Sequence, residues 1–342
     1  MGASDIPWTL IAAVAPIGAA AMTAILIFIL SPLLRRYALA KPGARSSHRV
    51  PTPQGGGIAV IIAATAAICV SSLFWLPELT TSSQLTTVFA AVVLLAGAGA
   101  LADMRPVAVA PRLLLQIVAV GAVVYQLPSD LHLLPILPSW IERSLLVFGG
   151  VWFVNLVNFM DGLDLITVAQ VVPITAAIAA IGMFGLLPPE AVVVSLAVCG
   201  AMIGFSFFNR PVASLFLGDV GSLPVGLVLG WLLVLLAGNG GCTAAFLLPL
   251  YPVADGTLTL LRRLFAGERV WEAHRSHYYQ RATDGGFSVI EVVARVFLTN
   301  IILCGLAVLS VIYPGRPVQL GALLGGTILV ALLLVTFARG KR

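Results

Sequence analysis

Long apolar segments, each about as long as a membrane-spanning helix, follow one another through almost the whole sequence. A transmembrane helix needs about 20 predominantly apolar residues. Of the 342 residues, 60% are hydrophobic and only 10% are charged, whereas soluble domains carry about 25% charged residues. The sequence therefore predicts an all-α integral membrane protein, a polytopic bundle of about eleven transmembrane helices. The expected helices lie near residues 6–30, 57–77, 86–102, 111–127, 144–160, 165–186, 189–208, 222–238, 242–260, 288–312 and 318–338.

The basic residues predict the orientation of these helices, because Lys and Arg favour cytoplasmic loops. With the N-terminus outside, only Arg143 and Arg316 fall in outside loops, and the C-terminus is cytoplasmic. The net charge of +5 then reflects short inside loops, so we expect no nucleic-acid partner. No linker or repeat divides the chain, and residues 1–342 are expected to form a single membrane domain.

Acidic residues lie at the inside ends of several expected helices. Asp103 ends the third, Asp161 and Asp164 follow the fifth, Asp219 precedes the eighth, and Asp255 lies near the inner end of the ninth. A charged side chain costs roughly 2.5–3.5 kcal/mol at the centre of a membrane helix, so these acids need water, a cation or a partner. Several of them converging on one face would hold a divalent cation.

The segment Asn158–Asp164 places three oxygen-bearing side chains at helical spacing. If the segment stays helical, Asn158, Asp161 and Asp164 lie along one stripe. Hard oxygen ligands suit Mg²⁺, with Mn²⁺ as the alternative, and leave positions for water and substrate phosphates. The competing interpretation is a solvated helix end with capping acids.

Two glycine-containing segments are candidate phosphate sites. In Leu217–Ser222, the glycines permit a tight turn, Ser222 is expected to cap a helix, and Asp219 would lie beside an anion with a metal between them. A purely structural turn is the alternative. The second segment is Gly55–Gly57, which follows Arg45-Ser-Ser-His48 and supplies cations and hydroxyl groups; a simple hinge is the alternative there.

The longest expected inside loop, residues 262–287, mixes cations with aromatic residues. Its cations would hold phosphates and its rings would contact a base or a sugar. An ordinary positively charged inside loop is the alternative. Zinc binding by its two histidines is disfavoured, because no Cys partner or HExxH pattern accompanies them. The loop includes Arg262, Arg263, Arg269, Trp271, His274, Arg275, His277, Tyr278, Tyr279 and Arg281.

Four ordered motifs together resemble the polyprenyl-phosphate N-acetylhexosamine-1-phosphate transferases along almost the whole chain. The last motif looks closest to members that start O-antigen or related surface polysaccharides. The motifs are Arg45-Ser-Ser-His48 with Pro51-Thr-Pro-Gln-Gly-Gly-Gly57, Asn158-Phe-Met-Asp-Gly-Leu-Asp164, Phe216-Leu-Gly-Asp-Val-Gly-Ser222 and Glu272-Ala-His-Arg-Ser-His277.

The resemblance implies that a polyprenyl (undecaprenyl) phosphate oxygen attacks the β-phosphorus of a UDP-N-acetyl sugar in a Mg²⁺-dependent reaction. UMP would be released at the cytoplasmic face of a bacterial inner membrane, among membrane lipids, with a homodimer as one arrangement. By motif position, Asp219 and Asp161 would bind the metal, and Asp103, Asp161, Asp164 and His277 would be catalytic. The implied substrate-binding residues are Arg45, Ser46, Ser47, His48, Gly56, Asn158, Gly218, His274, Arg275 and Arg281.

The chain departs from the family pattern at Ala102-Asp103, where the family usually has two adjacent aspartates. The missing first aspartate is often discussed as a base or a lipid-phosphate contact. A catalytically impaired or silent relative is therefore one alternative function. A polyprenyl-lipid or solute transporter is the other, although the sequence shows neither the inverted repeats nor the midplane charges typical of that class.

Overall fold

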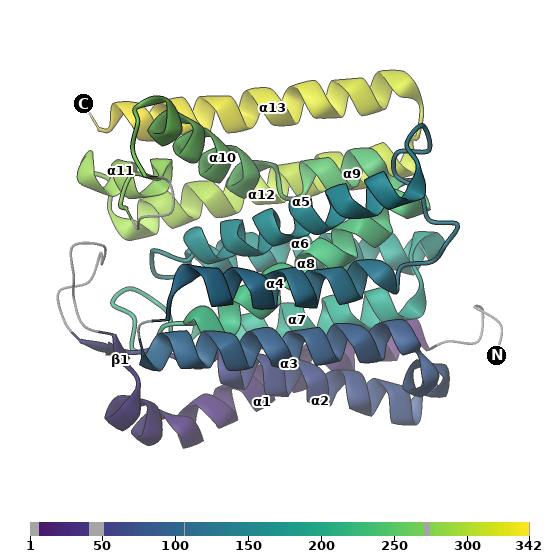
Figure 1. The fold of residues 1–342 in the computed structure, drawn as a ribbon, viewed down its shortest axis with the longest axis horizontal. Helices are drawn as coiled ribbons and strands as arrows, with labels where there is room; N and C mark the ends of the chain where they lie inside the picture. Colours follow the sequence, from purple (N-terminus) through teal and green to yellow (C-terminus); the bar gives the residue numbers. More distant parts are fainter. Residues whose placement is uncertain (1–6, 41–50, 106, 270–273, 342) are drawn as a thin grey trace.

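The computed structural model describes residues 7–40, 51–105, 107–269 and 274–341. Helices that run side by side make up almost all of this part of the chain (Figure 1). They are α1 Trp8–Tyr37, α2 Gly56–Phe74, α3 Ser83–Met104, α4 Val109–Tyr125, α5 Ser139–Phe159, α6 Ile166–Ile181, α7 Pro189–Ser206, α8 Asp219–Leu236, α9 Cys242–Leu247, α10 Leu250–Phe265, α11 Tyr278–Asp284, α12 Val289–Ile312 and α13 Arg316–Arg339, with short turns η2 Pro77–Thr81, η3 Gly182–Leu186 and η4 Ala237–Gly241.

Within the described residues, nine helical stretches are long and apolar enough to cross a membrane, and the apolar helix α4 is shorter. One of the nine is Asp219–Leu247, which η4 interrupts where Gly240 has a φ of 91°. The expected ninth helix, 242–260, is instead two helices, α9 and α10. They are separated at Pro249, which has no N–H to donate and crowds the preceding turn. The prediction of an all-α, multi-pass membrane protein is confirmed.

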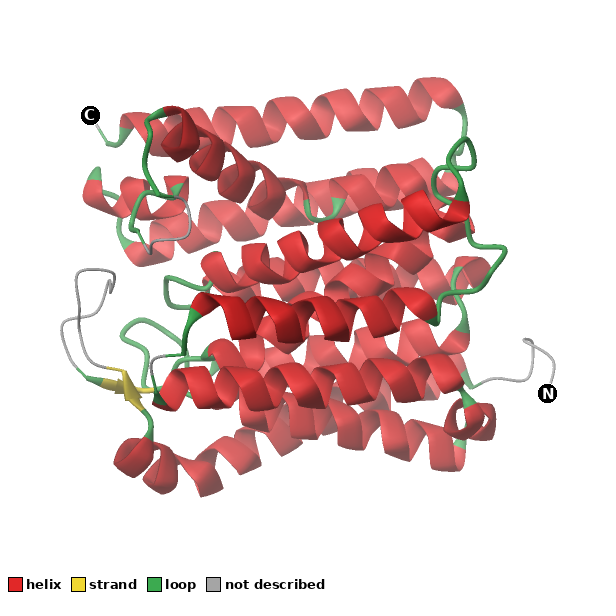
Figure 2. Ribbon diagram, in the orientation of Figure 1, coloured by secondary structure: helices red, strands yellow, loops and turns green. Residues whose placement is uncertain are grey.

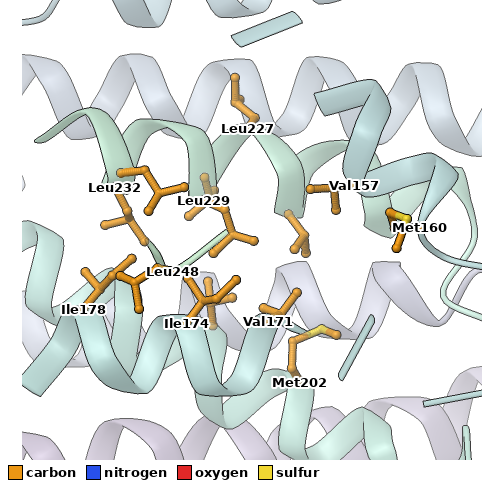
Figure 3. Close-up of a cluster of buried hydrophobic side chains, with 14 of the residues drawn as sticks. Val157, Met160, Val171, Ile174, Ile178, Met202, Leu227, Leu229, Leu232 and Leu248 are labelled. Carbon is orange, nitrogen blue, oxygen red and sulfur yellow. The ribbon is translucent and has the colours of Figure 1, made fainter. Parts of the chain in front are cut away.

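The core lies between the central helices α6, α7 and α8, which bury most of their residues. Figure 3 shows Ile174, Met202 and Leu229 from these three helices meeting in one apolar cluster. On the outer face, large apolar side chains stay exposed, among them Phe28 at 79% and Phe148 at 76%. Such exposure is a liability in water but suits contact with lipid. The burial pattern therefore agrees with a bundle that lipid surrounds.

The described residues also include a pair of two-residue strands, β1 Leu39–Ala40 and β2 Thr52–Pro53. They pair antiparallel, with Leu39 opposite Pro53. Strands this short carry no periodicity that a sequence could reveal. They lie at the end of the bundle where α11 and the end of α13 also lie, and we refer to it as the strand end (Figures 1 and 2).

Tight contact between α2 and α8 helps to form this end. Gly57 and Gly221 approach so closely that a Cβ on either glycine would overlap the backbone of the other. The preceding chain is fixed as well, because the amides of Gly56 and Gly57 donate to the carbonyls of Phe216 and Leu217, each at 2.9 Å. The segment Gly55–Gly57 therefore lies beside the segment that leads into α8.

Candidate active site

The first turn of α8 is capped by a side chain from another helix. Asp103, at the end of α3, accepts hydrogen bonds from the amides of Asp219 at 3.0 Å and Val220 at 3.1 Å. A carboxylate suits this place because the first amides of a helix lack partners and carry partial positive charge. Gly218 precedes the helix with a φ of 78°, a conformation that favours glycine. Ser222 was expected to be the cap, and that expectation is wrong.

Ser222 is instead one turn inside α8, where it donates to the carbonyl of Gly218 at 3.2 Å. It also accepts a hydrogen bond from Asn158, at 2.8 Å. The same Asn158 amide nitrogen donates to Asp219 Oδ1 at 2.8 Å. Asn158 therefore connects the end of α5 to the start of α8.

The other oxygen of Asp219 forms an ion pair at the strand end. Arg112 Nη2, at the start of α4, lies 2.6 Å from Asp219 Oδ2. Both side chains are partly exposed, at 29% and 27%. Arg112 was not predicted to be a site residue, because 107 positions separate it from Asp219 and no motif contains it. Its place at the start of the expected helix 111–127, on the same expected side as Asp103, was the one available signal.

The turn between α5 and α6 separates the two aspartates that were expected to share a helical stripe. Helix α5 ends at Phe159, and Leu165 has a φ of 62°, so the stretch between them is not helical and the stripe does not form. Asp164 is buried and accepts from the Ala213 amide at 3.0 Å, which ties this turn to the segment before α8. Asp161 accepts a hydrogen bond from the Thr167 hydroxyl.

Asp161 has an unusual electrostatic environment. Burial, followed by the nearby charges of Asp219 and Asp103, raises the pKa of Asp161 to about 7, although the Thr167 hydrogen bond opposes this. Several carboxylates crowded near one guanidinium favour the arrival of another cation. Asp161 is therefore a candidate cation ligand.

The C-terminal motif docks at the same end through Asp255 on α10. His277 Nδ1 lies 3.2 Å from Asp255 Oδ1, and the amides of Tyr278 and Tyr279 donate to the same carboxylate at 3.0 and 3.1 Å. The Tyr279 hydroxyl then donates to the carbonyl of Phe159 at 3.0 Å. This contact brings α11 to the turn that carries Asp161.

The other expected residues of the C-terminal segment contact residues of the same segment. The His274 ring lies 4.9 Å from the His277 ring, and its Nδ1 is 2.8 Å from Ser276 Oγ. Burial, together with the charges of His277 and Arg263, lowers the pKa of His274 to about 4. Arg275 pairs with Asp284 at 3.0 Å, and the Arg281 guanidinium lies 5.8 Å from the centre of the Tyr278 ring.

The remaining expected substrate-binding residues are Gly56 and residues 45–48. Gly56 packs against Phe205 and Leu215 so closely that a side chain there would overlap them, and its neighbour Gln54 donates to the carbonyl of Asp103 at 2.6 Å. These contacts show how the glycine segment reaches the end of α3. Arg45, Ser46, Ser47 and His48 lie outside the described residues.

The described residues include candidate donors for a metal ion. Among them, no group of three or more His, Cys, Asp or Glu side chains has metal-binding geometry. Asp219 and Asp161 are nevertheless hard oxygen donors at the same end of the bundle, and the charge of Asp219 contributes to the raised pKa of Asp161. Mg²⁺ commonly uses one or two carboxylates and completes its shell with water and substrate phosphates. The donor set fits a cation bound in that way and does not fit a closed protein cage.

The fold and this polar cluster define a multi-pass membrane protein with candidate anion-binding and cation-binding groups at one end of its bundle. The pattern of glycosyl transferase family 4 matches residues 85–237, which include Asp103, Arg112, Asn158 and Asp219. Relatives extend the similarity over most of the chain.

A phospho-N-acetylmuramoyl-pentapeptide-transferase of Synechococcus sp. is 30% identical over 86% of this chain and 91% of its own length. A decaprenyl-phosphate N-acetylglucosaminephosphotransferase of Mycobacterium leprae is 29% identical, with 86% and 82% covered. A probable undecaprenyl-phosphate N-acetylglucosaminyl 1-phosphate transferase of Bacillus subtilis is 25% identical, with 81% and 79% covered. The chain belongs to glycosyl transferase family 4, as its motifs predicted.

Proposed function

We propose that this protein transfers a sugar 1-phosphate, that of an N-acetylated hexosamine, from a UDP-sugar to a polyprenyl phosphate such as undecaprenyl phosphate. UMP is released, and the lipid-linked sugar starts a cell-surface glycan. The observation that carries the proposal is the convergence of Asp219, Asn158, Arg112 and Asp161 at one end of the bundle. Three relatives whose names contain sugar-phosphate transfer support it.

The reaction needs positioning and charge neutralisation more than covalent catalysis, because phosphoryl transfer passes through a loose transition state. Arg112 supplies a guanidinium for the phosphates, and Asn158 holds the Asp219 carboxylate in place. Asp219 and Asp161 would hold Mg²⁺, or Mn²⁺ in its place, which supplies further neutralisation of phosphate charge when bound. His277 and Arg281 on the C-terminal segment are the residues that we propose to contact the nucleotide sugar.

An apolar cavity of about 220 Å³ suits the lipid acceptor. It lies between α4, α5, α8 and α10 and begins at Val154, one helical turn from Asn158. The start of a prenyl chain in this cavity would leave its phosphate beside the polar cluster. The cavity walls include Val120, Leu146, Phe153, Leu227, Trp231 and Val253.

We place the strand end at the cytoplasmic face of a bacterial inner membrane and count eleven crossings. The nine apolar stretches become eleven when α4 is added and when the α9–α10 pair is counted separately from α8. An odd number agrees with α1 starting at the end of the bundle opposite to the end of α13 (Figure 1). The basic residues of the loops at the strand end favour this orientation.

The test is UMP release by the purified protein in nanodiscs supplied with undecaprenyl phosphate and a panel of UDP-sugars, with Mg²⁺ or with EDTA. We expect UMP and a lipid-linked product only when donor, acceptor and Mg²⁺ are all present. Asp219→Asn should abolish turnover, whereas Glu78→Gln, the same change at the opposite end of the bundle, should not. If no UDP-sugar yields UMP, the transferase function is wrong; transbilayer movement of the lipid without UMP would favour a transporter instead.

A further inference from the structure

Asp255 on α10 is the most completely enclosed acid of the described chain, with an exposure of 0%. A buried carboxylate is costly unless donors surround it. Two donors come from its own helix: the Tyr251 hydroxyl reaches Oδ2 at 3.3 Å and the Thr259 hydroxyl reaches Oδ1 at 3.3 Å. They lie one turn before and one turn after Asp255, and they satisfy only part of its hydrogen-bonding capacity.

The other donors arrive from a segment more than 20 positions away. Tyr278 donates its amide to Oδ1 and Tyr279 donates its amide to Oδ2, while His277 Nδ1 lies 3.2 Å from Oδ1. Backbone amides can only donate, so the carboxylate acts as the acceptor. The His277 ring must then carry a proton on Nδ1 to complete the set. The contact with Asp255 therefore favours the Nδ1-protonated ring.

The same carboxylate accepts hydrogen bonds from the first amides of α11. Tyr278 and Tyr279 are the first residues of α11, whose leading amides lack partners within the helix. With those amides held by Asp255, the Tyr279 ring points to the turn before Asp161, where its hydroxyl reaches the Phe159 carbonyl. The His277 ring stacks on the Tyr279 ring, with centroids 5.6 Å apart.

We propose that Asp255 is a positioning residue that holds His277 in the Nδ1-protonated form and docks the start of α11 against the Asp161 turn. Nε2 of His277 is then the ring nitrogen left to accept a hydrogen bond from substrate or water. The proposal rests on the proposed transferase function only where turnover is measured. Its structural half concerns the proton on His277 and the anchoring of α11.

The first experiment reads the proton directly and needs no turnover. The full chain, labelled with ¹⁵N-histidine and placed in nanodiscs, contains four histidines, and His277→Gln identifies the signal of interest. We expect the proton of the neutral ring on Nδ1 in the starting protein and a redistribution toward Nε2 in Asp255→Asn. A neutral wild-type ring that carries its proton on Nε2 would overturn the proposal, even if Asp255→Asn failed to fold.

The second experiment measures the docking of α11 by hydrogen exchange. In Asp255→Asn the amides of Tyr278 and Tyr279 should exchange roughly 10- to 100-fold faster, as expected when a charge-assisted hydrogen bond is lost. Tyr251→Phe is the matched control, because it removes a donor to the same carboxylate and leaves the three donors of residues 277–279 in place. Equal acceleration in both variants would mean that Asp255 only stabilises α10.

The third experiment separates action through His277 from general destabilisation. Asp255→Asn should lower kcat by roughly 10- to 100-fold, the cost usual when a partner that orients a functional imidazole is removed. The double variant Asp255→Asn/His277→Gln should lose less kcat than the product of the two single losses, because part of the effect of Asp255 passes through His277. Multiplying losses would refute positioning through His277. If the starting protein transfers no sugar phosphate, the proposed function fails, and the nitrogen and exchange measurements still decide the role of Asp255.

Discussion

Replacing Asp103 separates a positioning role from a direct catalytic role, because the structure commits both of its oxygens. Oδ1 accepts from the Asp219 amide and Oδ2 from the Val220 amide. Asp103→Ala removes both acceptors and the negative charge. Asp103→Asn keeps one acceptor oxygen and presents an NH₂ group to the second amide. The structure therefore predicts a graded loss, with alanine worse than asparagine.

The size of the loss follows from the cost of helix caps. Removing a capping side chain costs about 0.5–2 kcal/mol, and removing a negative charge from a helix N-terminus costs about 0.3–1 kcal/mol more. Because Asp103 caps two amides in a half-buried position, we place Asp103→Ala near 2 kcal/mol. Asp103→Asn should cost about half of that, near 1 kcal/mol. Turnover should fall in the same order, since the first residue of the uncapped helix is Asp219.

Unfolding by SDS in mixed micelles gives the free-energy differences, and UMP release gives the turnover. Asp130→Ala, at an exposed acid in the loop between α4 and α5, serves as the control and should change neither. The reasoning is refuted if both Asp103 variants keep the stability of the starting protein but lose turnover equally. That result would mean that the carboxylate acts directly on substrate.

Three further predictions concern Ala102, the loop 262–287 and His274. Ala102→Asp should raise kcat by roughly 10²–10⁴-fold, as measured by UMP release, if the missing family aspartate is a proton-transfer group; an unchanged kcat would show that this position is dispensable. A single cysteine in the loop 262–287 should be labelled only from the cytoplasmic side in oriented vesicles, and outside labelling would reverse the topology. His274 should stay neutral between pH 5 and 8 because its pKa is lowered to about 4. Folding stability that the neutral ring contributes should be present above about pH 6.5 and lost as pH falls toward 4. SDS unfolding of the protein and of His274→Gln measures this change.

The helices could be predicted from sequence because a membrane helix needs only a long apolar run, and such a run is a local property. The expected first helix, 6–30, overlaps α1, which runs from Trp8 to Tyr37, and the expected helix 288–312 is α12 almost to the residue. The helix bounds were predicted less accurately where the segment is amphipathic. Helix α10 is amphipathic and follows Pro249, so the expected ninth helix is divided.

The site was only partly predictable because pairing between distant residues leaves no local signal. The motifs contain Asn158 and Asp219, whose side chains hydrogen-bond at 2.8 Å. They did not reveal that Arg112 pairs with Asp219, or that Asp103 caps the same helix. The expected stripe of Asn158, Asp161 and Asp164 assumed continued helix, and the left-handed backbone at Leu165 could not be inferred from a leucine, which rarely adopts it.

The residues around Asp219 and the residues around Asp255 form two hydrogen-bonded clusters that meet at one short turn. Asn158, in the last turn of α5, belongs to the first cluster, and the carbonyl of the next residue, Phe159, accepts the Tyr279 hydroxyl from the second. Gly162 follows, and a Cβ there would overlap the Tyr279 hydroxyl, so this contact requires glycine. Asp161 lies in the chain between Phe159 and Gly162, which both contact the Tyr279 hydroxyl. Its position therefore depends on both clusters, which explains how a loop more than 100 residues away along the chain can determine the geometry beside Asp219.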